Sequence, residues 1–188
     1  MGNRLITMGL AVLMLALAVI AVFGFMAGMG TYWAWIAVAL LGVIVWFYNK
    51  LSTNTYVSWK DEYSVGVQVL DDDHKRLLYL INSFHTAAHY RIDMAFERQA
   101  LNEVVDYTKT HFAREEELMQ THQYPDFAVH KRQHEAMISK VNELVQRYEQ
   151  DRDGTIDELL KYLSTWLIQH ILGTDQKYSP HLASHGVH

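Results

Sequence analysis

Two pairs of metal-ligand residue types lie on either side of a short helix break, and this stretch constrains the chain more than any other. The pairs are His111 with Glu115 and His130 with His134, each four residues apart. On a helix that spacing places both side chains on one face, about one turn apart. Pro125, between the pairs, restricts the residue before it to extended geometry. The stretch therefore predicts a helical hairpin with potential metal ligands on both arms.

The beginning of the chain is apolar throughout. Residues 5–49 contain no Asp, Glu, Lys, Arg or His. A membrane-spanning helix needs ~20 apolar residues, so this run predicts two transmembrane helices, at about 5–28 and 32–48, in a membrane anchor of residues 1–50. The alternative is a cleaved signal peptide over residues 1–24, but the apolar run is longer than a typical signal core.

Charges flanking the apolar run predict its orientation. Arg4 lies at one end and Lys50 and Lys60 at the other. Because positive residues favour the cytoplasmic side, we expect a multi-pass protein of the inner (cytoplasmic) membrane with everything after residue 50 in the cytoplasm. Gly24 and Gly28 form a small-xxx-small pattern that permits a homo-oligomer through the hairpin, or they simply form the turn.

The overall charge and the absence of cysteine exclude some functions. The chain has 16 Lys and Arg, 21 Asp and Glu, and a formal net charge of -5. With no basic stripe it is not expected to bind nucleic acid. With no cysteine, disulfides and thiolate metal sites are excluded.

After the anchor, residues 51–70 have no helical period and predict an extended linker, with Trp59 and Tyr63 packing it onto the helices. Residues 71–178 then carry four amphipathic helices joined by short connections. The first helix is expected to begin at the acidic run Asp71–Asp73. The second is expected at about Asp93 to Thr121 and the third at Pro125 to about Tyr148. The fourth is expected to begin at the capping box Thr155–Glu158. Such helices predict an all-α fold, an up-down-up-down antiparallel four-helix bundle preceded by the transmembrane hairpin. The His-containing tail, 179–188, is expected to be disordered.

Polar residues interrupt the apolar stripes of all four helices. They are His74, His111, Glu115, His130, His134 and His170, and Asp175 lies five residues beyond His170, at or near the end of the fourth helix. Burying such groups without partners costs several kcal/mol each, and a metal removes that cost. Five imidazoles and two carboxylates are too many for one ion, but they suit two ions bridged by the carboxylates. Ligation by nitrogen and oxygen alone favours iron.

At this point the sequence resembles the hemerythrins, in particular the bacterial ones. The matching segments are Asp71–Lys75, His111-Phe112 with Glu115-Glu116, Tyr124-Pro125, His130 with His134, and Trp166-Leu167 with His170 and Asp175. The resemblance covers about residues 56–178 and fills all seven metal-ligand positions. It implies an oxo- or hydroxo-bridged non-haem di-iron centre that binds O2 reversibly.

The resemblance also implies roles for single residues. One iron is expected to carry His130, His134 and His170, the other His74 and His111, with Glu115 and Asp175 bridging. O2 is expected at the two-histidine iron, inside an apolar pocket that excludes water. The pocket candidates are Leu77, Phe112, Trp166 and Leu167, for which plain bundle core is the alternative.

The remaining histidines match no ligand position. His85 and His89 are expected in packing or at the surface, and His122 at a helix end, where a cation suits the dipole. His181, His185 and His188 lie in the tail, where metal binding would be adventitious. An acidic stretch after Glu149 resembles a calcium loop, but Leu160 replaces the bidentate Glu that such a loop needs.

Three classes of function fit these features. The favoured one is a membrane-tethered, non-enzymatic protein that stores O2 or delivers it to a membrane enzyme that consumes O2. The alternative is an oxygen or redox sensor acting through the hairpin or a partner. The third is a di-iron oxidase, peroxidase or NO-reducing enzyme. Oxygen-activating bundles are rich in carboxylates, whereas this ligand set is rich in histidine, which favours reversible binding.

Overall fold

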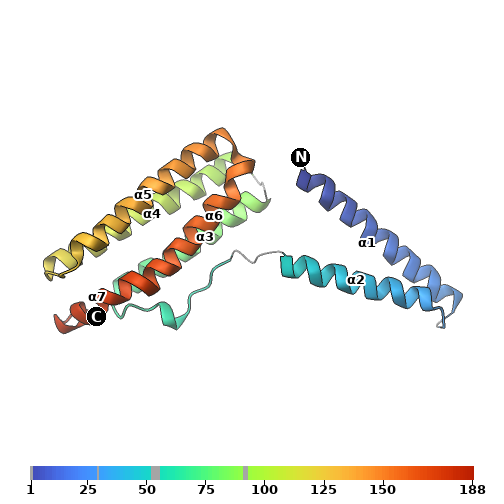
Figure 1. Ribbon diagram of the computed structural model, residues 1–188, viewed down its shortest axis with the longest axis horizontal. Helices are drawn as coiled ribbons and strands as arrows, with labels where there is room; N and C mark the ends of the chain where they lie inside the picture. Colours follow the sequence, from blue (N-terminus) through green and yellow to red (C-terminus); the bar gives the residue numbers. More distant parts are fainter. Residues whose placement is uncertain (1, 29, 52–55, 91–92) are drawn as a thin grey trace. The chain divides into compact units, whose positions relative to one another are not determined.

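The computed structural model describes residues 2–28, 30–51, 56–90 and 93–188 (Figure 1). The chain divides into two compact units, Met1–Asn54 and Thr55–His188. Residues 52–55 of the predicted linker, and Met29 in the predicted turn, lie outside the described residues.

Helices make up nearly all of the described chain. Their bounds are α1 Gly2–Ala27, α2 Tyr32–Leu51, η1 Asp61–Tyr63, α3 Gln68–Tyr90, α4 Met94–Thr121, α5 Phe127–Gln150, α6 Arg152–His170, η2 Ile171–Asp175 and α7 Gln176–Ser184.

The first unit is a hairpin of α1 and α2 that packs through small residues. Ala21, Ala34 and Ala37 are buried between the helices. A Cβ added to Gly24 would lie 2.8 Å from Ala34 Cβ, so glycine is needed there for the two helices to approach. Gly28 adopts a φ of +138° in the connection. The close approach at Gly24 is thus made within the chain, and self-association through this glycine stays a prediction.

The outer surface of this hairpin is covered with large apolar side chains. In the described chain one segment, Met8–Ala27, is long and apolar enough to cross a membrane, and only 6% of its most apolar window is buried. The apolar part of α2, Tyr32–Phe47, is shorter. A signal sequence meets the same criterion, so insertion into a membrane stays a prediction.

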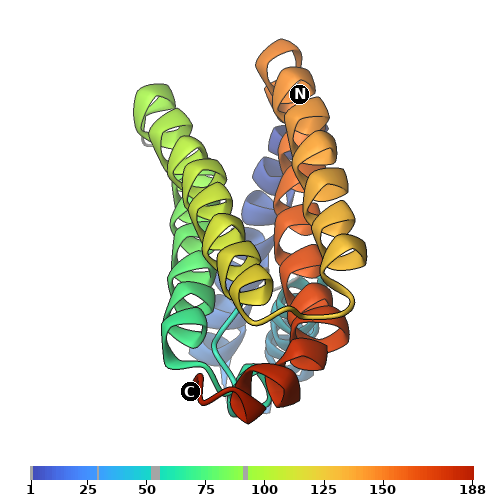
Figure 2. The same cartoon turned by 90° about the vertical axis from the view of Figure 1, so that its left-hand side faces the viewer.

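The second unit is a four-helix bundle of α3, α4, α5 and α6 (Figure 2). Its core is made by the apolar residues of those helices, including Leu77, Phe84, Leu101, Leu144 and Leu159, all fully or almost fully buried. The predicted all-α four-helix bundle is confirmed.

Two helices begin three residues earlier than predicted. α3 begins at Gln68, and the carboxylate of Asp71 instead accepts hydrogen bonds from Val65 N (2.8 Å) and from Ser64 Oγ, tying the preceding arm to the helix. α6 begins at Arg152, where Asp151 Oδ1 accepts from Gly154 N (3.0 Å). The capping box predicted at Thr155–Glu158 is therefore wrong.

The third start also differs. α5 begins at Phe127, two residues after Pro125, because the connection turns through Gln123 at a φ of +54°. The Tyr124 N–H there donates back to the Met119 carbonyl (2.8 Å). Proline therefore belongs to the turn rather than to the helix.

The arm before α3 is held by both backbone and side chains. Val57 N donates to Asn82 Oδ1 (2.9 Å), and Asn82 Nδ2 donates to the Val57 carbonyl (2.7 Å). Tyr63 is buried, and Trp59 packs against the core with Lys75 Nζ 5.0 Å from its ring. The predicted anchoring by these two aromatic residues is confirmed.

The C-terminal tail is a helix, and the prediction of disorder is wrong. α7 continues the chain from η2, and its Tyr178 and Leu182 are completely buried. The two lie four residues apart, so α7 has one apolar face, which packs on the end of the bundle.

Candidate metal centre

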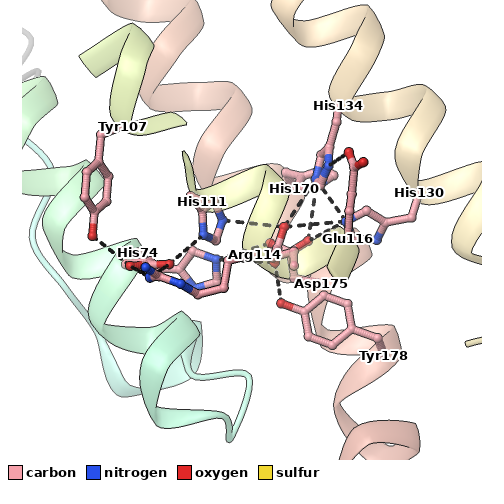
Figure 3. A network of polar contacts seen from close by, with 12 residues as sticks. His74, Tyr107, His111, Arg114, Glu116, His130, His134, His170, Asp175 and Tyr178 are labelled. Carbon is pink, nitrogen blue, oxygen red and sulfur yellow. Dashed lines mark hydrogen bonds and ion pairs between the residues drawn. The ribbon is translucent and has the colours of Figure 1, made fainter. Parts of the chain in front are cut away.

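All seven predicted ligands come together at one end of the bundle (Figure 3). They lie near the start of α3 and α5 and near the end of α4 and α6, since antiparallel neighbours bring these ends together. None is more than 4% exposed. The set is His74 on α3, His111 and Glu115 on α4, His130 and His134 on α5, His170 on α6 and Asp175 at the end of η2.

Three histidines form the denser half of the site. His134 Nε2 lies 3.0 Å from His130 Nε2 and 3.1 Å from His170 Nε2. Glu115 Oε2 lies 3.2 Å from His134 Nε2, and Asp175 Oδ1 lies 3.0 Å from His170 Nε2. These five residues can place their ligand atoms within 4.8 Å of one another, as one ion requires.

The other half has two histidines. His74, His111 and Glu115 form a second group whose ligand atoms can lie within the same distance. His111 Nε2 is 3.5 Å from Glu115 Oε2, and the rings of His74 and His111 are 4.7 Å apart. Glu115 belongs to both groups, so the two potential ion positions are adjacent.

The carboxylates span the two halves. Asp175 turns Oδ1 toward His170 and His130 and Oδ2 toward His74, at 3.5 Å from His74 Nε2. Glu115 Oε2 faces the three-histidine group, while Oε1 lies 4.0 Å from His74 Nε2. Two carboxylates arranged in this way can each bridge a pair of ions.

A π-helical turn supplies the fifth ligand of the three-histidine group. Asp175 lies five residues after His170, which in a regular α-helix would leave it about 140° around the axis. The wider turn of η2 over Ile171–Asp175 returns it to the His170 face. Single π turns within α-helices are frequent at functional sites.

The donor set fits metal ions. Most of the buried side-chain atoms without a hydrogen-bond partner in the described chain belong here. They are both ring nitrogens of His74, His111 Nε2, Glu115 Oε2 and both oxygens of Asp175. His130, His134 and His170 point Nε2 atoms at one another, and two lone pairs cannot satisfy each other. Cations between these atoms would satisfy the ring nitrogens and carboxylate oxygens that face the site, which for His74 means Nε2 alone.

The carboxylates are held in the ionised state. Burial raises the pKa of Glu115, but its closeness to the imidazoles of His111, His130 and His134 outweighs burial and holds that pKa well below its usual range. Burial and Glu115 raise the pKa of Asp175, yet its contacts with His170 and His74 leave it lowered. Both groups therefore act as acceptors only, as ligands must.

Sequence reasoning missed the groups that orient the histidines. His134 Nδ1 donates to Glu116 Oε1 (3.2 Å), and Lys131 Nζ donates to Glu116 Oε2 (2.6 Å). Such a contact fixes the tautomer and leaves Nε2 free to bind a metal. Glu116 follows a ligand directly, so no helical spacing distinguished it.

His111 has a matching partner. Its Nδ1 lies 3.4 Å from Asp73 Oδ2, and Asp73 also accepts hydrogen bonds from Tyr107 OH (2.7 Å) and from Arg114. Burial would raise the pKa of Asp73, but hydrogen bonds from His111, Tyr107 and Arg114 lower it to about 2. The sequence pattern marked the buried Asp73 only as part of an acidic helix start.

Tyr178 was also missed. Its hydroxyl donates to Glu115 Oε1, and burial together with the Glu115 charge raises its pKa well above the usual value. From its position on α7, Tyr178 thus holds one oxygen of Glu115, a carboxylate that both ligand groups share. No sequence signal singled it out beyond its place three residues after Asp175.

The four predicted pocket residues line one cavity beside the site. Its volume is about 10 Å³, at the lower limit for one water-sized molecule. Phe112 stacks on His134 at 3.6 Å and Trp166 on His170 at 4.2 Å. The wall is apolar apart from Thr108, whose hydroxyl donates to the Val104 carbonyl. The lining is Leu77, Ile81, Val104, Thr108, Phe112, Met137, Leu163, Trp166 and Leu167.

The fold and the site together define a class. This is a four-helix bundle protein with two adjacent potential metal positions that share a carboxylate, differ in their number of histidines and include no cysteine. These features are typical of non-haem di-iron proteins.

The chain belongs to the hemerythrin family, since the hemerythrin HHE cation binding domain matches residues 65–182. Bacteriohemerythrin of Stenotrophomonas maltophilia is 41% identical over 127 residues, which cover 68% of this chain and 82% of that protein. Bacteriohemerythrin of Pseudomonas aeruginosa is 38% identical over 123 residues, covering 65% and 79%. Myohemerythrin-1 of Phascolopsis gouldii is 36% identical over 120 residues, covering 64% and 89%.

Solved structures agree. Wild-type hemerythrin superposes with a TM-score of 0.62 at 27% identity, covering 68% of this chain and 98% of that one. A point mutant of hemerythrin gives 0.63 at 26% identity. Family membership makes the chain a non-haem di-iron, O2-binding protein, and the expected di-iron cofactor is confirmed. The apolar hairpin lies outside residues 65–182.

Proposed function

We propose that this chain is a membrane-tethered O2 carrier that stores O2 or delivers it to a membrane enzyme that consumes it. The observation that carries the proposal is the unequal pair of ligand groups beside a small apolar cavity. When bound, the di-iron centre supplies the coordination position at which O2 is held.

We assign His130, His134 and His170 to one iron and His74 and His111 to the other, with Glu115 and Asp175 shared. The two-histidine group has fewer protein donors, so the open position belongs there. Glu116 and Asp73 orient His134 and His111 by accepting hydrogen bonds from their Nδ1–H groups.

The pocket residues act by excluding water. Leu77, Phe112, Trp166 and Leu167 are apolar or nearly so and enclose a cavity too small for more than one small molecule. Water and protons favour release of reduced oxygen and oxidation of the metals, so a dry wall favours reversible binding. We infer carriage rather than catalysis from this wall and from the small number of carboxylates.

The tether is supported by the first unit. Large apolar side chains such as Leu15, Phe23 and Trp33 are exposed, and they need a lipid or protein environment. O2 is apolar and partitions into hydrocarbon, so a carrier anchored at a bilayer would load close to that reservoir. Confinement to one surface also raises the effective concentration of carrier and consumer.

The topology of the proposal puts the bundle on the cytoplasmic side. Protease added to right-side-out cells should spare the bundle, and protease added to inverted vesicles should release a fragment cut near residues 50–58. Digestion of the bundle from outside would overturn this topology and favour a signal peptide over residues 1–24.

An oxygen or redox sensor is the second candidate. The hydrogen bond from Tyr178 to Glu115 favours it, because a change at the shared carboxylate would be felt by α7. An optical spectrum of reduced protein exposed to air separates the two. A visible band that appears with O2 and disappears when O2 is removed supports carriage, whereas rapid irreversible oxidation favours sensing.

A further inference from the structure

A second cluster of histidines lies at the end of the bundle where α7 packs, apart from the di-iron ligands. His122 caps the end of α4, His181 lies on α7, and His185, four residues later, caps the end of α7. The rings of His181 and His185 are 4.6 Å apart, and those of His122 and His185 are 5.5 Å apart. We propose that these three imidazoles form a second metal site, for a divalent transition ion such as Zn2+.

Backbone carbonyls fix the tautomers of the two α7 histidines. His181 Nε2 lies 2.7 Å from the His122 carbonyl oxygen, and His185 Nδ1 lies 2.8 Å from the His181 carbonyl oxygen. A carbonyl only accepts, so each of these nitrogens carries the proton. The other nitrogen of each ring, His181 Nδ1 and His185 Nε2, is left with its lone pair. Metal-binding histidines characteristically donate their second N–H in this way.

The third donor comes from another element. Within the described chain, the ring nitrogens of His122 make no hydrogen bond, and its ring faces His185. Among the described residues only the di-iron ligands have donor atoms that all lie within 4.8 Å of one another, so an ion at this cluster must draw the three rings closer together. His185 is exposed and His122 and His181 are half-buried, which leaves room for small adjustments that keep the carbonyl hydrogen bonds. Three imidazole nitrogens about 2.0–2.1 Å from the ion leave a fourth, tetrahedral position for water. Imidazole donors suit Zn2+, Cu2+ and Ni2+.

A second histidine pair has the same helical spacing as His181 and His185 but lacks a third imidazole from another part of the chain. His85 and His89 on α3 are also four residues apart, but their rings lie parallel (7°) at 5.9 Å. Burial and the nearby His89 lower the pKa of His85. The ring that faces this pair from another element is Tyr56, not a third imidazole. This pair therefore serves as the matched control.

Metal bound at the cluster would join the α4–α5 turn to α7. The hydrogen bond between His181 and the His122 carbonyl already links these segments. Because α7 also carries Tyr178, the ion would hold in place the helix that fixes Glu115. The ion would thus bind apart from the di-iron centre but act on a helix that contacts it.

The test uses the full chain in detergent, loaded with iron. Co2+ is titrated while its visible d–d absorption and the iron content are followed, and Zn2+ is then added to displace it. We expect one Co2+ per chain with iron unchanged, and affinity lowered on the order of tenfold or more in His185→Ala and in His122→Ala. His89→Ala should bind as the parent does.

Two outcomes would overturn the proposal. One is Co2+ binding of unchanged affinity in a His122→Ala, His185→Ala double variant. The other is an equal loss in His89→Ala, which would assign the binding to scattered surface histidines. A Zn2+-dependent rise in melting temperature in the parent, absent in His185→Ala, gives a second readout, because a ligand of the folded state stabilises it.

Discussion

Each end of the bundle buries carboxylate charge within a polar cluster, and the two ends differ in how completely that charge is paired. At the far end, Glu97 is 0% exposed and accepts hydrogen bonds from Tyr148 OH (2.6 Å) and from Arg152 Nε and Nη2 (2.8 and 2.6 Å). Arg152 also donates to the Ala88 carbonyl (2.9 Å). At the other end, Glu115 and Asp175 face imidazoles, and three of their four oxygens lack a hydrogen bond.

This difference separates a structural cluster from a functional one. The Glu97 cluster neutralises its charge with Arg152 and ties α3, α4, α5 and α6 together, so it needs nothing from outside. The ligand cluster brings lone pairs to face lone pairs, which is tolerable only if cations lie between them. Buried charge alone is therefore a poor sign of function, and incomplete pairing is a better one.

The largest expected effect is on the incompletely paired end. His134→Ala or His111→Ala should remove the bound iron, because each deletes a ligand and leaves shared carboxylates uncompensated. The parent should contain two irons per chain by elemental analysis. Finding one metal, or zinc, in parent protein expressed with adequate iron would contradict the assignment.

The opposite end should respond in stability and not in metal content. Glu97→Gln removes the charge that balances Arg152, and we expect a loss of about 3 kcal/mol, at the low end for a broken buried pair because Arg152 keeps Asp153. The exposed pair Arg98–Glu149 is the control, and Glu149→Gln should cost about 0–1 kcal/mol. Denaturant unfolding measures both, and iron loss in Glu97→Gln would weaken the distinction between the two ends.

The cavity wall allows a finer test at the ligand end. Leu167→Ala and Leu159→Ala, both on α6, should each cost about 2–5 kcal/mol, because both side chains are buried. Only Leu167 lines the cavity beside the site. Autoxidation followed optically should therefore accelerate in Leu167→Ala alone, and equal rates in the two variants would assign Leu167 to plain packing.

The smallest expected effect is a change with pH in the unfolding free energy contributed by Tyr148, beside Glu97. Burial and the hydrogen bond to Glu97 raise the pKa of Tyr148 from 10.0 to about 12. The folded state thus holds this proton more tightly, so its stabilising contribution is complete below pH 10 and is lost as the pH rises toward 12. The difference in unfolding free energy between parent and Tyr148→Phe should shrink over that window. A constant difference would show that the hydroxyl is not desolvated.

The ligands were predictable because the sequence keeps them in helical register. His111 with Glu115 and His130 with His134 need only the α-helical repeat. Asp175 does not follow that repeat, since it reaches His170 through a π turn. Its place near the helix end made it a candidate, and the resemblance added its bridging role. The four pocket residues followed from their closeness to ligands along the helices.

Other parts depend on contacts distant in sequence. Glu97 and Arg152 are separated by 55 residues, and nothing local marks either as buried. The order of α7 depends on Tyr178 and Leu182 meeting the end of the bundle, a surface that the tail's own composition does not reveal. The start of α6 was misplaced because Asp151 and Thr155 are both good caps, and Thr155 is buried instead.

The pairing of Val57 with Asn82 determines how a mechanical load would enter the bundle. Tension along the chain from the apolar hairpin reaches the second unit at Tyr56 and Val57, and the Asn82 amide holds this segment by two hydrogen bonds. Asn82 lies on α3, the helix that carries His74. Any load would therefore pass into a ligand helix eight residues from its imidazole.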